Sequence, residues 1–210
     1  MSKILYIQAS PRRERSHCIA AADAFIKIYK QAHSDDEIDT LKVFETTLPD
    51  FDGFAVQAKY AILHGQPHTP QQAQAWKGIE RIIEQFKAAD KYLIAVPMWN
   101  FSIPYRLKQY LDIIVQPGYT FSYSASAGYK GLVAGRPLLV VYARGGDYRP
   151  GNKNQAFDLQ TKYIELIFAF MGFTHIQSVI IEPTLQGGPD VAAAVRQEAI
   201  QKLRMIAPDF

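Results

Sequence analysis

Short runs of almost continuous apolar residues constrain the fold of this chain more than any other feature. Four of them stand out, at 4–8 (ILYIQ), 92–96 (YLIAV), 138–143 (LLVVYA) and 176–181 (IQSVII). Runs of this length and composition are typical of strands that are buried on both faces, as in a parallel sheet covered by helices. A fifth run, 38–44 (IDTLKVF), alternates between apolar and polar residues and predicts a strand nearer an edge.

Helical patterns fill the intervals between these runs. Apolar residues recur at helical spacing within 18–29, 70–86, 103–114, 157–171 and 189–203. Thr69, Pro70 and Gln72 predict a capping box with proline in the first turn. Ser102 and Pro104 predict the cap and first turn of the following helix. The segment 157–171 is apolar nearly all round and ends before a glycine, so we expect it to be buried, partly against a partner.

The alternation of strands and helices predicts an α/β fold with one open parallel sheet and helices on both faces. Five strands favour a flavodoxin-like three-layer sandwich with strand order 2-1-3-4-5 over a six-stranded dinucleotide-binding sheet. Two intervals interrupt the alternation. Residues 50–69 predict an irregular excursion, and residues 118–137 predict a small strand-and-turn insertion. No repeat, low-complexity tract or linker divides the chain, so we expect one domain over 1–210.

Composition narrows the class of protein. The 23 Lys and Arg residues against 20 Asp and Glu give a formal charge of +3, which is too small and too dispersed to favour nucleic-acid binding. The single cysteine, Cys18, excludes an intrachain disulfide. No apolar run approaches the roughly 20 residues of a membrane span, and the N-terminal stretch lacks the pattern of a signal peptide. The expected location is therefore the cytoplasm.

Ligands of such sheets bind beyond the carboxyl ends of the strands, near the reversal in strand order. The loops after the first, third and fourth strands are therefore candidates. The first, 9–18 (ASPRRERSHC), has neither a glycine-rich dinucleotide signature nor a Walker signature. Its Ser10 and Ser16 hydroxyls, with the free amides where Ser16, His17 and Cys18 begin a helix, predict a phosphate site. The alternative is a simple Ser16 cap among solvated arginines.

The other two loops have features suited to a flat ligand. In 97–101 (PMWNF), backbone amides and Asn100 would pair with the polar edge of a heterocycle, while Trp99 and Phe101 cover its apolar surface. In 143–146 (ARGG), paired glycines allow the backbone to approach a ring closely. The alternatives are a turn that tucks two aromatic residues into the core, and a plain glycine turn. All three loops fall at the same end of the predicted sheet.

Other candidate sites have weaker support. Gly65 and Pro67 exclude a helix between His64 and His68, so a metal pair is not expected there, and we predict no metal site elsewhere. Cys18 lies near a helix N-terminus, a position that lowers thiol pKa values. No catalytic partner accompanies it in a known pattern, so we interpret it as structural. The chain also lacks the G-x-S-x-G nucleophile elbow.

Four motifs follow one another along nearly the whole chain. They are MSKILYIQASPRRERSHC (1–18), PMWNFSIPYRLKQYLD (97–112), GYTFSY (118–123) and ARGG (143–146). Together they resemble the FMN-dependent NADH:azoreductase and NAD(P)H:quinone oxidoreductase family. The resemblance implies a flavodoxin-like fold, noncovalently bound FMN and a homodimer with the active site at its interface.

The resemblance also assigns residues to the flavin by position. Those implied to hold the phosphate are Ser10, Ser16, His17 and Cys18. Those implied to line the isoalloxazine ring are Met98, Trp99, Asn100 and Phe101, and those implied to border its pyrimidine edge are Ala143, Arg144, Gly145 and Gly146. Cys18 and Ala143 depart from the family, which often has hydroxyl residues there. Candidates for the wall of the acceptor pocket, with core packing as the alternative, are Tyr119, Phe121 and Tyr123.

The activity implied by the resemblance is hydride transfer from NAD(P)H through FMN to quinones and azo compounds, by two electrons in a ping-pong cycle. The flavin carries that chemistry, so no catalytic side chain is expected. The alternative is a flavodoxin-like electron carrier or redox-sensing FMN-binding subunit without turnover of small molecules. Such carriers are usually strongly acidic, and the slight positive charge of this chain counts against that reading. A flavin-free binding module is a third hypothesis.

Overall fold

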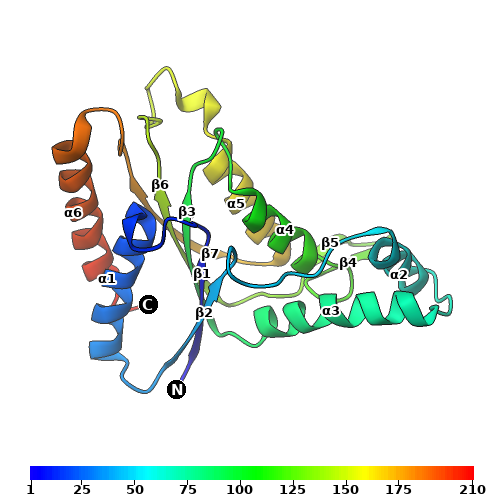
Figure 1. The fold of residues 1–210 in the computed structure, drawn as a ribbon. Coiled ribbons are helices and arrows are strands. Elements are labelled where there is room, and N and C mark those ends of the chain that lie inside the picture. Colours follow the sequence, from blue (N-terminus) through cyan, green and yellow to red (C-terminus); the bar gives the residue numbers. More distant parts are fainter.

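A five-stranded parallel sheet forms the middle layer of the protein (Figure 1). The computed structural model describes residues 1–210. The strands of the sheet are β1 (Lys3–Gln8), β2 (Glu37–Lys42), β3 (Lys91–Pro97), β6 (Pro137–Ala143) and β7 (His175–Ile181). Their spatial order is β2-β1-β3-β6-β7, which confirms the predicted order and the predicted edge position of β2.

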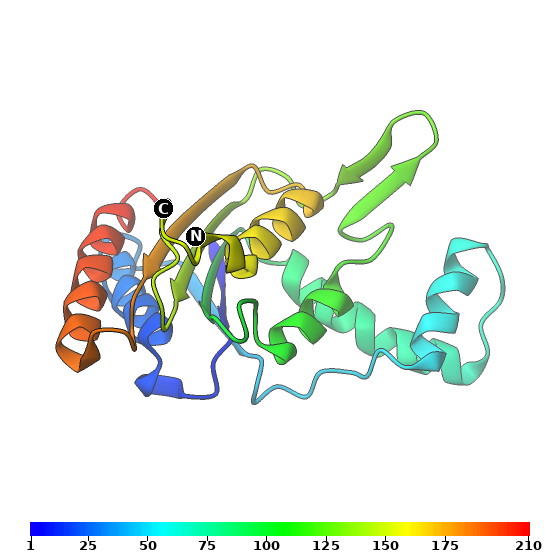
Figure 2. The same cartoon turned by 90° about the horizontal axis from the view of Figure 1, so that it is seen from above.

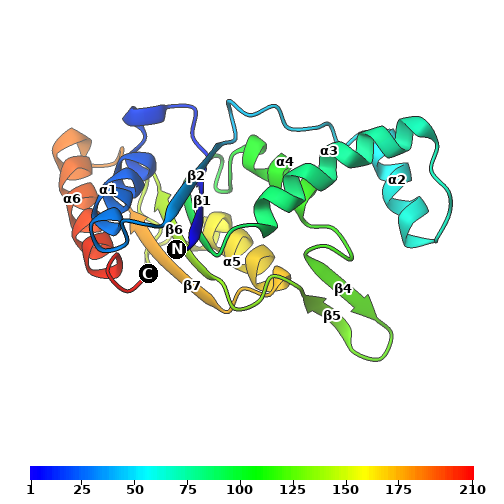
Figure 3. The same cartoon turned by 90° about the horizontal axis from the view of Figure 1, so that it is seen from below.

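Helices cover both faces of this sheet (Figures 2 and 3). One face carries α1 (His17–Ala32) and α6 (Gly188–Ile206), and the other carries α3 (Pro70–Lys87), α4 (Tyr105–Ile114) and α5 (Leu159–Met171). Neighbouring residues of each central strand point to opposite faces. Leu5 and Ile7 therefore join a core of 30 buried residues with α3, α4 and α5, whereas Ile4 and Tyr6 join a core of 19 with α1 and α6. This arrangement is the predicted three-layer sandwich.

The starts of two helices test the capping predictions. The Thr69 hydroxyl accepts a hydrogen bond from the Gln72 amide, and the Gln72 side chain accepts one from the Thr69 amide, so the predicted capping box of α3 is confirmed. The prediction that Ser102 caps α4 is wrong. The helix begins at Tyr105 with Pro104 at the N-cap position, because the residue before a proline is biased towards extended backbone and delays the helix.

Two segments extend beyond the sheet. The first is α2 (Gly53–Leu63), whose N-cap Asp52 accepts a hydrogen bond from the Ala55 amide at 3.0 Å. The prediction that 50–69 is irregular is therefore wrong over the length of this helix, because the turn residues at its two ends obscured a helix between them. The second is the hairpin of β4 (Phe121–Ser124) and β5 (Gly128–Gly131), which confirms the predicted insertion (Figure 3).

The hairpin is attached to the C-terminal end of α5. The Val133 amide donates a hydrogen bond to the Met171 carbonyl at 2.9 Å. A side-chain carbon on Gly131 would lie only 2.2 Å from the backbone nitrogen of Gly172, so these two backbones touch. Gly172 itself ends α5 with a φ of 108°, a conformation that favours glycine.

Helix α5 is only partly buried. Ile164, Phe168 and Met171 lie in the core, whereas Leu166 is 70% exposed. The expectation of a buried helix therefore holds for one stripe of its surface, and an apolar stripe remains uncovered in the single chain. None of the helices has both the length and the apolar composition that a bilayer span requires.

Candidate functional site

The three candidate loops meet at one edge of the sheet. They follow β1, β3 and β6, which are consecutive neighbours in the sheet although distant in sequence. Backbone hydrogen bonds continue past the strand ends, from the Ala9 amide to the Ala95 carbonyl at 2.9 Å and from the Met98 amide to the Ala143 carbonyl at 2.8 Å. The structure thus brings together the segments that sequence reasoning grouped.

The first loop leads into α1 with buried hydroxyl groups. Ser10 and Ser16 are both buried. Ser16 occupies the N-cap position but its hydroxyl forms no capping hydrogen bond; its Oγ lies 3.1 Å from the Cys18 Sγ instead. The reading of Ser16 as an ordinary helix cap therefore has no support in the geometry. The start of α1 keeps free amides beside two hydroxyls, which is a donor set suited to an anion.

His17 adds a polar atom without a partner at the same place. Its Nδ1 is buried and forms no hydrogen bond within the chain. Burial, together with the nearby charges of Arg196 and Arg12, lowers the pKa of this imidazole below its ordinary value. The ring is therefore neutral near pH 7, with one nitrogen able to donate and the other to accept.

Cys18 is fully buried beneath this loop. Burial raises the pKa of its thiol to about 11. The thiol therefore stays protonated at neutral pH, where only a thiolate would act as nucleophile. Its side chain belongs to the core between the sheet and α1, as the structural interpretation expected.

The second loop contains a tight turn from Trp99 to Ser102. The Trp99 amide donates to the Ser102 carbonyl at 3.0 Å, and the Ser102 amide donates to the Trp99 carbonyl at 2.9 Å. The two central residues have positive φ values, 46° at Asn100 and 69° at Phe101. This is the pattern of a two-residue type I′ turn, which suits asparagine but strains a phenylalanine. Strained backbone of this kind concentrates at ligand sites.

The aromatic residues of this turn are not part of the core. Phe101 is exposed, and its ring lies 5.3 Å from that of Phe157. Trp99 is half-buried, with its ring 5.6 Å from that of Phe44. The structure therefore contradicts the alternative in which this turn places two aromatic residues in the core. Asn100 is exposed between them and its amide is free to meet a ligand.

The third loop is organised by the buried side chain of Arg144. Its guanidinium pairs with Asp158 at 2.9 Å and with Glu182 at 3.5 Å, and its Nε donates to the Gln160 Oε1 at 3.0 Å. Gln160 in turn donates to the Val96 carbonyl at 3.1 Å. Arg144 therefore ties the ends of β3, β6 and β7 to the start of α5. Its side chain faces the protein interior rather than the loop surface.

This network has no signal in the sequence, because Asp158, Gln160 and Glu182 follow no motif with Arg144. The two glycines after Arg144 have separate surroundings. A side-chain carbon on Gly145 would lie 2.8 Å from the Leu185 Cδ1, so a larger residue there would displace the exposed Leu185 side chain. The corresponding atom on Gly146 would meet the Tyr148 ring at 3.3 Å.

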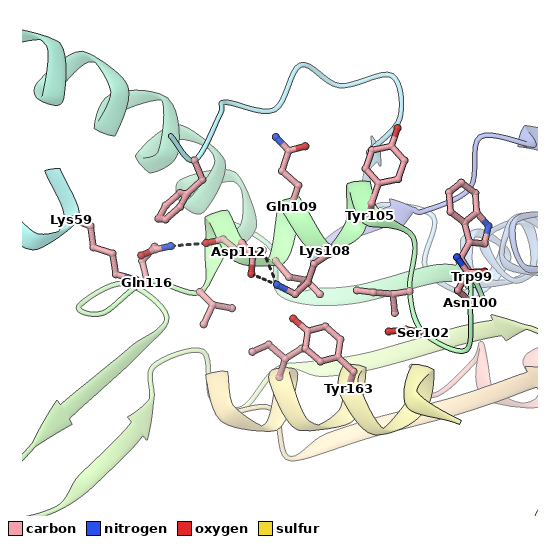
Figure 4. Close-up of a pocket in the computed structure, with 15 residues that line it drawn as sticks. Lys59, Trp99, Asn100, Ser102, Tyr105, Lys108, Gln109, Asp112, Gln116 and Tyr163 are labelled. Carbon is pink, nitrogen blue, oxygen red and sulfur yellow. Dashed lines mark hydrogen bonds and ion pairs between the residues drawn. The ribbon is translucent and has the colours of Figure 1, made fainter. Parts of the chain in front are cut away.

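A cavity of about 910 Å³ opens at the Trp99–Ser102 turn and runs along α4 (Figure 4). Trp99 and Asn100 lie at one end and Lys59 of α2 lies at the other, with Tyr163 of α5 along its wall. Lys108 and Asp112 form an ion pair at 2.6 Å beside it. The α4 and α5 residues of this cavity were not among the predicted site residues, because their sequence pattern indicated only the surface of a helix.

The three candidate acceptor-pocket aromatics lie elsewhere. The Tyr119 hydroxyl donates to the Glu80 carboxylate at 2.6 Å, and Phe121 packs on Phe170 near the end of α5 with a ring separation of 4.8 Å. Tyr123 is 63% exposed on the hairpin. The flavin-loop residues lie near the opposite end of α5, about 20 Å away for a helix of this length. One chain alone does not bring these aromatics to the loops.

No group of three or more His, Cys, Asp or Glu side chains is placed to hold a metal ion.

Comparison with known proteins gives the family. The family model described as "Flavodoxin-like fold" matches residues 2–206. The FMN-dependent NADH:quinone oxidoreductase of Nitratidesulfovibrio vulgaris is 55% identical over 100% of both chains. The corresponding protein of Desulfotalea psychrophila is 47% identical over 99% of this chain and 96% of its own. The chain belongs to this family.

Solved structures of relatives agree with that assignment. An azoreductase from Bacillus anthracis superposes with a TM-score of 0.91, at 28% identity over 100% of both chains. An FMN-dependent NADH-azoreductase from the same species, solved in complex with FMN, gives a TM-score of 0.88 at 29% identity, over 99% of this chain and 98% of its own. The family resemblance and the fold it implied are therefore confirmed.

Proposed function

We propose that this protein is an FMN-dependent NADH:quinone oxidoreductase that also reduces azo compounds. The observation that carries the proposal is the gathering of three family motifs, on the loops after β1, β3 and β6, at one edge of the sheet. The names of the full-length relatives give the reaction, and the FMN-bound relative supports the cofactor.

The residues present at this edge fit FMN. The hydroxyls of Ser10 and Ser16 and the free backbone amides of His17 and Cys18 at the start of α1 would hold the phosphate. The Met98–Phe101 segment would line the flat ring, with the exposed Asn100 amide directed to its polar edge. Ala143, Gly145 and Gly146 would border the pyrimidine side through their backbone. The contribution of Arg144 would be to position these loops, since its guanidinium is engaged inside the protein.

FMN, when bound, supplies hydride transfer between NADH and a quinone or azo acceptor. The work of the chain is to bind, orient and shield. The type I′ turn presents Asn100 and Phe101 in a fixed geometry, and the Arg144 network holds the third loop before any ligand arrives. Backbone amides of the third loop would stabilise negative charge at the pyrimidine edge.

We further propose that two copies of the chain assemble with the active site at their interface. The exposed Tyr105 of α4 lines the cavity that begins at the Trp99–Ser102 turn, and the exposed Leu166 of α5 follows three residues after Tyr163, which also lines it. A second copy seated there would cover this surface. Its hairpin segment, which carries Tyr119, Phe121 and Tyr123, would bring to the loops the aromatic residues that one chain leaves at a distance.

Anaerobic stopped-flow absorbance tests the proposed activity. The FMN-loaded protein is mixed first with NADH and then with a quinone, while the flavin absorbance is followed. We expect bleaching by NADH and recovery on addition of the quinone. Absence of bleaching with both NADH and NADPH, together with reduction by a protein reductase, would instead support an electron carrier and refute the proposed oxidoreductase.

A further inference from the structure

A second pocket lies between the starts of α1 and α6, and no predicted phosphate-site hydroxyl lines it. Its volume is about 440 Å³. Arg12 and His17 enter it from the first loop and α1, and Arg196 enters it from α6. None of its nine lining residues is acidic. The pocket is therefore positively charged and has no internal counter-charge.

Both arginines are free of ion pairs. Neither Arg12 nor Arg196 forms a salt bridge or a side-chain hydrogen bond within the chain. The cations near Ser10 behave differently, since Arg13 and Lys42 both pair with Glu45, at 2.9 Å and 3.6 Å. The chain thus neutralises the charges on the serine side of the loop and leaves those on the α6 side uncompensated.

His17 joins these two cations. Its Nδ1 is buried without a hydrogen-bond partner, and the charges of Arg196 and Arg12 lie nearby. A buried polar atom left unpaired costs free energy, so such an atom is rare unless a ligand or water meets it. The nearby guanidinium charges disfavour a protonated imidazole, and an anion between the three groups would relieve that repulsion. Planar guanidinium groups match the oxygen geometry of a phosphoryl group.

We propose that Arg12, His17 and Arg196 form a subsite for a phosphoryl group of a nucleotide. The inference rests on the proposed function, because FMN and the nicotinamide donor both carry phosphoryl groups. The phosphoryl group belongs either to FMN or to the donor, and the experiment distinguishes these two sources.

The test compares Arg196→Gln with Arg204→Gln, a matched loss of one positive charge from the exposed end of the same helix. The affinity of the full-length chain for FMN and for riboflavin, which lacks the phosphate, is measured by flavin fluorescence titration. For the FMN-loaded variants, KM and kcat are then measured with NADH and with NADPH. Thermal melting shows whether each variant is folded. If Arg196→Gln does not fold, Arg12→Gln replaces it in the same measurements, because Arg12 is exposed and its substitution should not disturb the core.

If the subsite holds FMN, Arg196→Gln weakens FMN binding about tenfold or more and leaves riboflavin binding unchanged. If it holds the donor, FMN affinity is unchanged and KM for NADH or NADPH rises about tenfold with kcat unchanged. Equal FMN affinity and equal KM in Arg196→Gln and Arg204→Gln would overturn the inference. That result would not affect the proposed function. The proposed function would be refuted only if neither NADH nor NADPH reduced the flavin of the unmodified protein.

Discussion

Among single residues, Arg144 has the environment that is most sensitive to change. Its side chain is 1% exposed and forms ion pairs with both Asp158 and Glu182. Removing one member of a buried ion cluster leaves the others without compensation. We expect Arg144→Ala to lower the free energy of unfolding by about 3–5 kcal/mol in urea denaturation without FMN. Arg149→Ala is the control, because Arg149 pairs with Asp147 at the surface, where the loss of an ion pair has little effect on stability. Equal effects would contradict the assigned role.

Cys18 makes the stability depend on pH in the alkaline range. Its thiol pKa is raised by burial from 9.0 to about 11. Between these two values the folded state keeps a proton that the unfolded state has lost, so the free energy of unfolding falls as the pH rises. Between pH 8 and about pH 11 the free energy of unfolding should fall in both proteins. We expect the fall to be smaller in Cys18→Ala than in the unmodified protein, by up to about 2 kcal/mol. Parallel losses in urea denaturation of the two proteins would contradict a buried, protonated thiol.

At the scale of elements, substitutions in the Trp99–Ser102 turn can distinguish the role of Asn100 in the backbone geometry from its contact with the ligand. Asn100→Ala and Asn100→Gly both remove the side-chain amide, but only glycine adopts the φ of 46° without strain. We expect Asn100→Ala to be less stable than Asn100→Gly by about 1 kcal/mol in urea denaturation. FMN affinity should fall in both variants, because both lose the amide that we assign to the ring. Unchanged FMN affinity in the glycine variant would remove Asn100 from the site.

The contact between β5 and the end of α5 sets the position of the hairpin. Gly131→Ala would push a methyl group into the Gly172 backbone, which has no flexible side chain to yield. We expect a loss of about 1–3 kcal/mol of unfolding free energy. Gly53→Ala is the matched control, since Gly53 has open space around its α-carbon and starts α2. The control should be neutral or slightly stabilising, and a similar loss in both variants would show that the close contact is unimportant.

At the scale of the whole molecule, the uncovered apolar surface predicts self-association. Leu166 on α5 is 70% exposed, and a charge placed there would be buried in the proposed dimer. We expect Leu166→Glu to raise the dimer dissociation constant at least about tenfold in sedimentation analysis. Met205→Glu is the control, because Met205 is 80% exposed on α6, which covers the other face of the sheet. Monomeric behaviour of the unmodified protein would contradict the assembly.

Local chemistry accounts for what sequence reasoning predicted correctly. Apolar runs define the strands because both faces of the sheet are buried, and the Thr69 capping box is a contact between residues three apart. The Ser102 cap was wrong because the effect of Pro104 on the preceding residue outweighed the capping preference of serine. The buried contacts of Arg144 and the approach of Arg196 to His17 join residues that are distant in sequence. Such contacts depend on tertiary packing and have no local pattern.

The strand order β2-β1-β3-β6-β7 also decides when the site can exist during synthesis. The first loop leaves the ribosome early, but its neighbours in the sheet end at Pro97 and Ala143, and Arg196 follows near the C-terminus. The chain loses conformational entropy when such long stretches close, before the contacts that offset this loss have formed. No N-terminal fragment can therefore assemble the complete site. Uptake of FMN would report that the sheet has assembled through β6 and the loop after it, so the appearance of flavin colour would mark that step of folding.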